Sequence, residues 1–104
     1  MEYALVLTTC PNEQEARDLA TRIIAGRLAA CVQLSKIESF YIWKDEACIE
    51  PEVRLTIKTR TRLYDRLESF IKKHHSYAVP QVVMIPIEDG SEAYLDWIDE
   101  NTNL

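Results

Sequence analysis

Two adjacent histidines, His74 and His75, are the residues of this sequence best suited to holding a metal ion. Imidazole is a good ligand for copper and zinc. Adjacent side chains diverge by roughly 100° in a helix and point to opposite faces of a strand, so both rings can meet one ion only at a bend of the chain or between subunits. The alternative is a solvated helix end, where positive charge complements the helix dipole.

The three cysteines offer a second kind of chemistry. Cys31 is either a thiolate that binds a soft metal or acts as a nucleophile, or a small buried strand residue. No histidine or other base stands near it in the sequence, which favours burial. Cys48 lies near a predicted hairpin turn and is expected to be exposed. The odd number of cysteines and the lack of a CxxC motif predict free thiols in a reducing cytoplasm rather than a disulfide framework.

A third group combines aromatic and basic side chains. Lining a cleft between subunits, these side chains would suit a small anionic ligand. The alternative is interface packing for the aromatic residues and a solvated helix start for the basic ones. The group consists of Trp43, Lys58, Arg60, Arg62 and Tyr77.

Other kinds of site are disfavoured. Gly26 and Gly90 are the only glycines, so there is no glycine-rich phosphate loop. No nucleophile, base and acid stand in a recognisable motif, and the sequence predicts a binding or signalling module rather than an enzyme. Acidic residues near the hairpin turn would attract hard cations weakly, or form a solvated turn. These acidic residues are Asp45, Glu46, Glu50 and Glu52.

Length and composition limit the class of protein. A chain of 104 residues with 47% apolar and 28% charged residues predicts one globular domain, residues 1–104. The net charge of −5 disfavours nonspecific binding to nucleic acid or to anionic membranes. No apolar run approaches the roughly 20 residues that a membrane span needs. The first residues lack the basic region of a signal peptide, so we expect a cytoplasmic protein.

A long β-hairpin is the main feature that must position these residues. From Val53 to Arg60, apolar and polar residues alternate, as in a half-buried strand. The first arm begins at Leu28 and resumes over Ile37–Trp43, and the polar stretch Lys44–Pro51 predicts the turn. An unbroken arm from Ala30 to Trp43 would span roughly 45 Å, so about half of the hairpin would overhang its sheet. The alternative is a break at Ser35–Lys36, which gives two short strands and a loop.

The elements before and just after the hairpin follow simple patterns. Residues 3–9 predict a buried strand. Asn12 and Glu15 mark the start of a helix that Gly26 would cap. After the hairpin, Thr59 or Thr61 is predicted to cap a second helix, which ends before Pro80. The apolar stripe of that helix is Leu63, Leu67, Phe70 and Ile71.

The last third of the chain predicts one strand and one helix. Val82–Ile87 is almost entirely apolar and predicts a strand covered on both faces, with Pro86 at a sheet edge or bulge. Gly90 and Ser91 open a final helix, and a polar tail is expected from Asn101. The order of elements predicts an α+β, ferredoxin-like βαββαβ sandwich with a long hairpin and an extra C-terminal helix. Two helices cover only one face of such a sheet, so a second copy of the chain is expected to cover the other.

Several phrases, in this order and at these spacings, resemble the CutA-type divalent-cation-tolerance proteins, and the match extends over nearly the whole chain. They are Arg27–Gln33 (RLAACVQ), Ser39–Trp43 (SFYIW), Ile57–Thr59 (IKT), His75–Pro80 (HSYAVP) and Tyr94–Ile98 (YLDWI). The resemblance implies a ferredoxin-like subunit in a homotrimer knitted together by long hairpins, and a role in copper binding and metal tolerance. It also implies a shape similar to the trimeric PII signalling proteins.

The resemblance also implies which residues bind metal. In some members a cysteine near the end of the first strand joins the histidine pair. Thr8 occupies that position here, and Cys10, two residues on and on the same strand face, is the substitute that we expect. The predicted copper ligands are therefore His74, His75 and Cys10, with Trp43, Lys58 and Tyr77 as candidates in a PII-like cleft for an anion.

The sequence departs from the family pattern at four positions. Ser76 and Ala78 stand where the family has Pro and Glu, Asp45 where it has Gly, and Gln33 where Asn is common. The fold assignment does not depend on these positions. The carboxylate that the family places at position 78 is absent from this chain.

Overall fold

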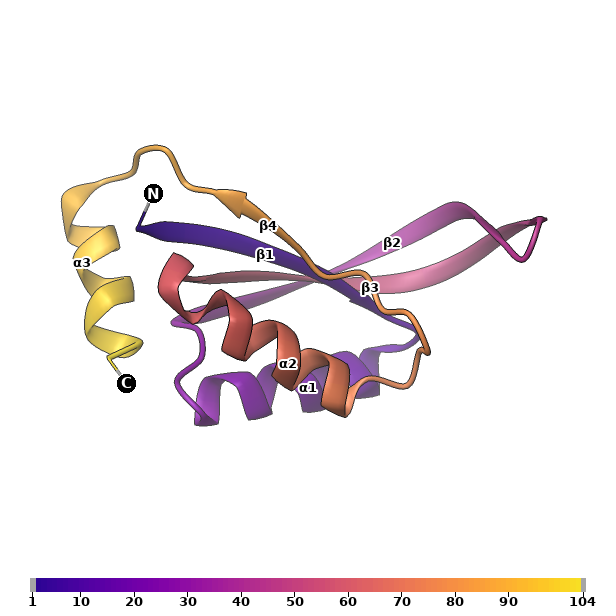
Figure 1. The fold of residues 1–104 in the computed structure, drawn as a ribbon, viewed down its shortest axis with the longest axis horizontal. Coiled ribbons are helices and arrows are strands. Elements are labelled where there is room, and N and C mark those ends of the chain that lie inside the picture. The colour runs from indigo at the N-terminus through magenta and orange to yellow at the C-terminus, as the bar shows by residue number, and fades with distance from the viewer. Residues whose placement is uncertain (1, 104) are drawn as a thin grey trace.

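The computed structural model describes residues 2–103. Four strands and three α-helices form one layer of sheet with helices packed on it (Figure 1). In chain order the elements are β1 (Tyr3–Cys10), α1 (Glu13–Ala25), β2 (Cys31–Trp43), β3 (Glu46–Arg60), the short 3₁₀ helix η1 (Thr61–Leu63), α2 (Tyr64–His74), β4 (Val83–Pro86) and α3 (Glu92–Asn101).

The sheet is antiparallel, with the strand order β2-β3-β1-β4. Helices α1 and α2 cover one face, and α3 lies at the end of the sheet away from the hairpin (Figure 1). This confirms the predicted ferredoxin-like α+β sandwich with an additional C-terminal helix.

Alternation along the strands and helical spacing together explain the core. On β3, Val53, Leu55 and Ile57 point toward the helices, as the sequence pattern predicts, and each is at most 6% exposed. The predicted stripe of α2 is confirmed, since Leu67 and Ile71 are fully buried. The buried cluster consists of Val6, Cys10, Ala16, Leu19, Ile23, Leu28, Ala29, Val53, Leu55, Ile57, Leu67 and Ile71.

The hairpin is unbroken, which confirms the longer of the two predicted arms. Strands β2 and β3 form 13 residue pairs, from Cys31 with Lys58 to Trp43 with Glu46. Strand β1 backs β3 only as far as Val53, so seven of the pairs overhang the sheet. We call Cys31–Lys36 with Val53–Lys58 the proximal hairpin, and Ile37–Trp43 with Glu46–Glu52 the distal hairpin.

The turn of the hairpin is shorter than predicted. The interpretation of Lys44–Pro51 as a loop was wrong, because β3 begins at Glu46 and Pro51 pairs with Glu38 inside the ladder. Only Lys44 and Asp45 form the turn, with φ of 52° and 64°. Two consecutive residues with positive φ match the twist of paired strands, which lets a two-residue turn join long arms.

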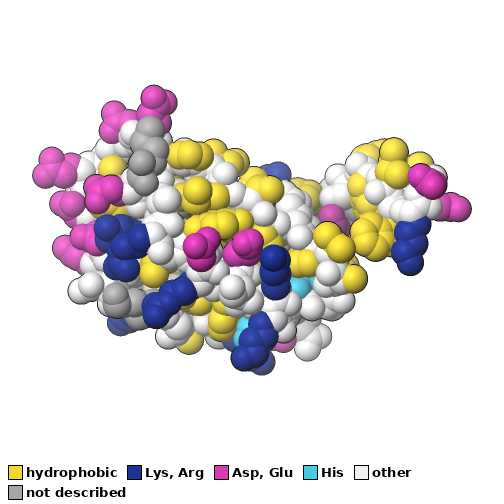
Figure 2. All heavy atoms as spheres, in the orientation of Figure 1, with side chains coloured by type: hydrophobic (Ala, Val, Ile, Leu, Met, Phe, Trp, Pro, Cys, Tyr) yellow, Lys and Arg dark blue, Asp and Glu magenta, His cyan; other side chains and the backbone are white. Residues whose placement is uncertain are grey.

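The distal hairpin carries exposed apolar side chains. Phe40, Ile42 and Ile49 are 69%, 76% and 61% exposed. Figure 2 shows hydrophobic side chains on this projection, which stands out from the rest of the molecule. The chain as a whole measures 44 × 25 × 22 Å.

Strand β4 corrects one prediction. Val83 and Ile85 are 43% and 45% exposed, so this strand is not covered on both faces within the chain. It pairs with β1 alone and forms a sheet edge, which agrees with the placement of Pro86. The apolar run is therefore covered only if another molecule packs against it.

The helix ends confirm some predicted caps and correct others. Asn12 Oδ1 accepts a hydrogen bond from the Glu15 amide at 2.8 Å, and Ser91 Oγ caps α3. Gly26 is the C-cap of α1, but the left-handed residue is Arg27, with φ of 56°.

Neither threonine caps α2. Thr59 Oγ1 donates to the Leu28 carbonyl at 2.6 Å, and η1 and α2 begin without a side-chain cap. The polar tail also starts later than expected, since α3 includes Asn101 and Thr102 is fully buried.

Candidate metal site and aromatic cleft

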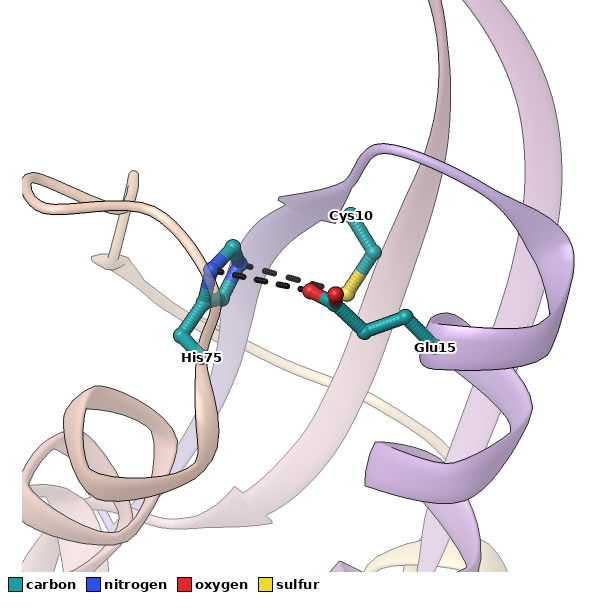
Figure 3. A group of neighbouring side chains, drawn as sticks. All are labelled: Cys10, Glu15 and His75. Atoms are coloured by element: carbon teal, nitrogen blue, oxygen red, sulfur yellow. Dashed lines mark hydrogen bonds and ion pairs between the residues drawn. The ribbon is translucent and has the colours of Figure 1, made fainter.

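Three side chains from the ends of three elements converge beside the first strand (Figure 3). Cys10 is the last residue of β1, Glu15 lies in the first turn of α1, and His75 directly follows α2. One potential ligand atom from each residue lies within 4.8 Å of the others. The group forms because the short connection from β1 to α1 brings the start of the helix over the end of the strand.

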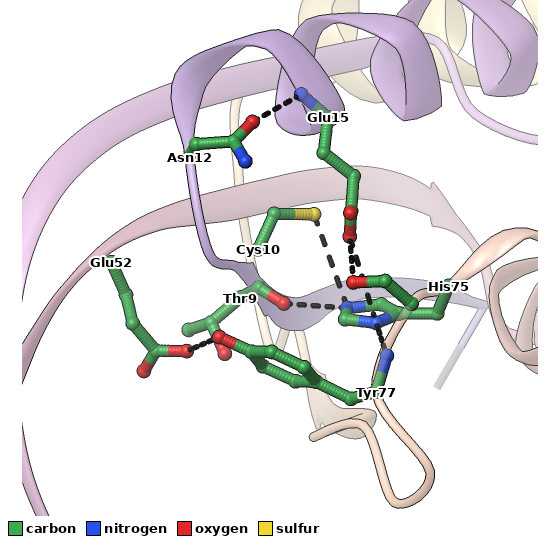
Figure 4. A network of polar contacts seen from close by, with 8 residues as sticks. Thr9, Cys10, Asn12, Glu15, Glu52, His75 and Tyr77 are labelled. Carbon is green, nitrogen blue, oxygen red and sulfur yellow. Dashed lines mark hydrogen bonds and ion pairs between the residues drawn. The ribbon is translucent and has the colours of Figure 1, made fainter.

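The hydrogen bonds of His75 fix the state of its ring (Figure 4). Nε2 lies 2.6 Å from the Thr9 carbonyl oxygen, which can only accept, so Nε2 carries the proton and donates. Nδ1 accepts the Tyr77 amide hydrogen at 3.0 Å. The lone pair of Nδ1 therefore points toward the Tyr77 amide, and a metal ion at this atom would have to displace that hydrogen bond.

The Glu15 carboxylate lies opposite Nδ1. Its Oε2 is 3.8 Å from Nδ1 and accepts a hydrogen bond from Ser76 Oγ at 2.9 Å. The imidazole nitrogen and the carboxylate oxygen are both atoms that can bind a metal ion.

The Cys10 thiol completes the group. Its Sγ lies 3.9 Å from His75 Nε2. Burial raises the pKa of the Cys10 thiol to about 12, and the negative charges of Glu15 and Glu52 act in the same direction. The free thiol is therefore protonated at neutral pH and a weak nucleophile, and it becomes a thiolate only when a cation replaces its proton.

This donor set fits a soft or borderline divalent ion. One thiolate, one imidazole and one carboxylate suit zinc or copper better than the oxygen-seeking magnesium or calcium. In a tetrahedral site the ligand atoms would lie about 3.3–3.7 Å apart. The three ligand atoms lie within 4.8 Å of one another, so the side chains would have to move by up to about 1 Å to close the group. The Nε2 bond to the Thr9 carbonyl is the kind of outer contact that orients a metal-binding histidine.

The predicted ligands are only partly brought together. Cys10 and His75 lie in the group, whereas the His74 ring remains on α2 and packs against Phe70, with ring centroids 4.4 Å apart. The divergence of adjacent side chains explains this separation. Thr8, which stands where some family members have a cysteine, is fully buried on β1.

The other two cysteines lie elsewhere. Cys31 is half-buried on β2, where it pairs with Lys58. Cys48 is also half-buried rather than exposed as predicted, and its Sγ donates to the Glu46 carbonyl at 3.7 Å. Both are free thiols, as is Cys10.

An aromatic cleft of about 600 Å³ lies between the distal hairpin and the segment that follows His75. Trp43 and Tyr77, both predicted to line a ligand cleft, are at this site. The Tyr77 hydroxyl donates to Glu52 Oε2 at 2.8 Å (Figure 4). The main lining residues are Phe40, Tyr41, Trp43, Glu52, Tyr77 and Val79.

The predicted cations lie away from this cleft within the chain. Lys58 Nζ sits 5.2 Å from the ring centroid of Tyr94 on α3. Arg60 pairs with Asp99 and Glu2, and Arg62 donates to the Thr102 carbonyl. The contacts of Lys58 with Tyr94 and of Arg60 with Asp99 attach α3 to β3, which is a structural role.

The sequence analysis did not single out two residues of the candidate sites. Glu15 had been noticed only as part of a helix-start signal, and Glu52 only as part of an acidic cluster. The signal for Glu15 was available, because the two residues Pro11 and Asn12 leave no room for α1 to start away from the end of β1. No sequence pattern indicated a role for Glu52, because the predicted turn, Lys44–Pro51, ends directly before it and Glu52 was interpreted as a turn residue.

The comparisons with known proteins now identify the family. The model of the family described as CutA1 divalent ion tolerance protein matches residues 4–101. The chain belongs to this family.

Relatives with about 40% sequence identity support the same family assignment. The Divalent-cation tolerance protein CutA of Thermus thermophilus is 40% identical over 99 residues, which are 94% of this chain and 96% of that protein. The Protein CutA homolog of Danio rerio is 41% identical over 99 residues, and the chain spans 66% of its length.

Solved structures confirm the fold. The CutA structure from Archaeoglobus fulgidus matches with a TM-score of 0.95 and 35% identity, over 97% of this chain and 99% of that one. That protein is described as a periplasmic divalent cation tolerance protein, which does not agree with the cytoplasmic location expected from the sequence. None of the helices in residues 2–103 has the length and apolar character of a bilayer-crossing segment.

Proposed function

We propose that this protein binds a divalent metal ion, chiefly copper, through Cys10, Glu15 and His75, and that this binding underlies a role in metal tolerance. The convergence of a thiol, a carboxylate and an imidazole within 4.8 Å is the observation that carries the proposal. The names of the family and of its relatives support the general role in divalent-cation tolerance.

We propose binding rather than catalysis as the activity of the site. The thiol is held protonated and both nitrogens of the imidazole are hydrogen-bonded, so neither group is prepared to attack a substrate. The anion-binding alternative receives no support from the chain itself, because Lys58 lies beside Tyr94 and not in the cleft.

We also propose that the chain works as a cytoplasmic homotrimer. The exposed apolar side chains of the distal hairpin and the half-exposed edge strand β4 are surfaces that further copies would cover. The three free thiols favour a reducing compartment. Light scattering in dilute buffer tests the assembly, and a stable single subunit would contradict it.

Calorimetric titration of the metal-free protein with copper tests the site. We expect Glu15→Gln and His75→Ala each to lower the affinity at least about tenfold, since each removes a ligand. Cys48→Ser and His74→Ala are matched controls that remove a thiol and an imidazole outside the group and leave the affinity unchanged. Equal copper affinity in the wild type and in both site variants would show that Glu15 and His75 are not ligands.

The pH dependence provides an independent check. Because the Cys10 pKa is about 12 and the bound form needs a thiolate, metal binding releases one proton. The apparent affinity should therefore rise about tenfold for each pH unit between about pH 7 and 9. The same titration repeated at three pH values measures this slope, and Cys10→Ser should flatten it.

A further inference from the structure

Glu15 is held by hydrogen bonds at both of its ends. Its backbone amide donates to Asn12 Oδ1 at 2.8 Å, which fixes the first turn of α1 (Figure 4). Its carboxylate accepts the Ser76 hydroxyl hydrogen at 2.9 Å, so a residue from the segment after α2 determines where the far end of the side chain lies. The two contacts together place the carboxylate beside His75.

The Ser76 hydroxyl is the strongest donor on this carboxylate. Nδ1 of His75, 3.8 Å from Oε2, accepts the Tyr77 amide hydrogen and has no proton to give. The Cys10 thiol also faces Glu15, but a thiol is a weak donor. A hydroxyl bond to an ionised carboxylate is charge-assisted, which makes it stronger than a bond between neutral groups.

Without this contact, the side chain of Glu15 would have little reason to stay beside His75. It lies in the first turn of α1 and is 24% exposed. A glutamate side chain loses much rotational freedom when it is held in one conformation, so it otherwise samples several rotamers in solvent. The hydroxyl therefore removes that freedom before any ion binds.

The position of Ser76 is itself well defined. It directly follows His75, whose Nε2 donates to the Thr9 carbonyl at 2.6 Å. This bond ties the backbone of the segment to the end of β1. The hydroxyl thus fixes the carboxylate relative to the imidazole, although Ser76 is exposed and contributes nothing to the core.

We propose that Ser76 is a positioning residue of the candidate metal site, and that its hydroxyl holds the Glu15 carboxylate ready for a divalent ion. A carboxylate has about four lone pairs, so the hydroxyl occupies one and leaves the others for the ion. Hydrogen bonds of this kind orient the carboxylate ligands of metal sites. The inference rests on the proposed metal binding, in which Ser76 is not a ligand.

NMR of the metal-free protein tests the positioning without any ion. Three-bond couplings to the β protons of Glu15 should show one dominant rotamer in the wild type and averaging in Ser76→Ala. Ser76→Thr keeps a hydroxyl and should restore the wild-type couplings. Equal couplings in the wild type and in Ser76→Ala would overturn the proposal.

Calorimetric titration with copper sulfate tests the effect on binding. We expect Ser76→Ala to lower the affinity about tenfold, as loss of an outer contact does at other metal sites, and Ser76→Thr to recover most of it. Ser69→Ala removes a hydroxyl from the exposed surface of α2 and is the matched control. The melting temperature of the metal-free variants should not change, whereas a merely structural role would lower it.

A double-mutant cycle shows whether the hydroxyl acts through Glu15. In a Glu15→Ala background, Ser76→Ala should cause no further loss of copper affinity. A full further loss would overturn the proposal, because the hydroxyl would then act on the ion by another route.

The same titrations separate this inference from the proposed function. If Glu15→Ala lowers the affinity and Ser76→Ala does not, the role of Ser76 is wrong and the metal site stands. If neither Glu15→Ala nor His75→Ala changes the affinity, the metal site itself is wrong, and the role of Ser76 falls with it.

Discussion

The proximal and distal hairpins belong to the same two strands, share one unbroken ladder of pairs and differ in almost every other respect. In the proximal part, Leu55 and Ile57 are fully buried under the helices. In the distal part, Ile42 and Ile49 are 76% and 61% exposed. The backbone pairing alone therefore does not determine burial, and the third strand and the helices make the difference.

The comparison shows that similar residues serve different purposes along one strand. Apolar side chains in the proximal hairpin stabilise the fold of the single chain. Those in the distal hairpin add nothing to that core, and a soluble protein retains such a surface where it contacts a ligand or another chain.

The largest expected effect comes from truncating the core. Ile57→Ala should lower the free energy of unfolding by about 2–5 kcal/mol at any protein concentration. Ile49→Ala is the matched control, since it changes the same residue type on the same face of the same strand. Its effect should depend on concentration, because only another chain can cover it. Urea unfolding at two concentrations measures both, and equal losses in dilute solution would contradict the distinction.

A second change should dissociate the proposed trimer without unfolding the chain. Replacing both Phe40 and Ile42 by Ser removes two exposed apolar side chains, and we expect the dissociation constant to rise about 100-fold or more. Native mass spectrometry measures the assembly and circular dichroism the fold. Glu38→Ser, on the same face of the hairpin, is the control. An unchanged mass would show that the distal side chains do not join subunits.

The smallest expected effect is at the turn. Asp45 has a φ of 64°, a conformation that costs a residue with a side chain more than it costs glycine. Asp45→Gly should therefore raise the stability by about 0.5 kcal/mol, whereas Asp45→Ala should lower it. Thermal unfolding measures both shifts. A loss of stability in the glycine variant would show that the Asp45 side chain contributes more than the backbone conformation costs.

Much of this fold was predictable because its signals are local. The alternation from Val53 to Arg60 and the stripe of Leu63, Leu67, Phe70 and Ile71 each identify an element from its own residues. The turn was misplaced because charged residues such as Glu46 and Glu50 look like loop residues, although an exposed strand tolerates them equally well. Burial of β4 was overestimated because an apolar run does not reveal whether the covering molecule is the same chain.

The candidate site was harder to predict because it depends on tertiary geometry. The resemblance indicated His75, and strand alternation indicated Cys10. Glu15 joins them because α1 begins over the end of β1, which the two-residue connection of Pro11 and Asn12 indicates only once both elements have been placed. Lys58 was assigned to the cleft by its residue type, but its position on β3 takes it to α3.

The three residues from His75 to Tyr77 contribute to both candidate sites, and this has a thermodynamic consequence. An ion at Nδ1 displaces the Tyr77 amide from this atom, while the Ser76 hydroxyl stays on Glu15. Ser76 and Tyr77 also form part of the wall of the aromatic cleft. An ion bound there would therefore change the conformational freedom of one wall of the cleft. Linkage would then couple metal binding to occupation of the cleft, with the same factor in both directions.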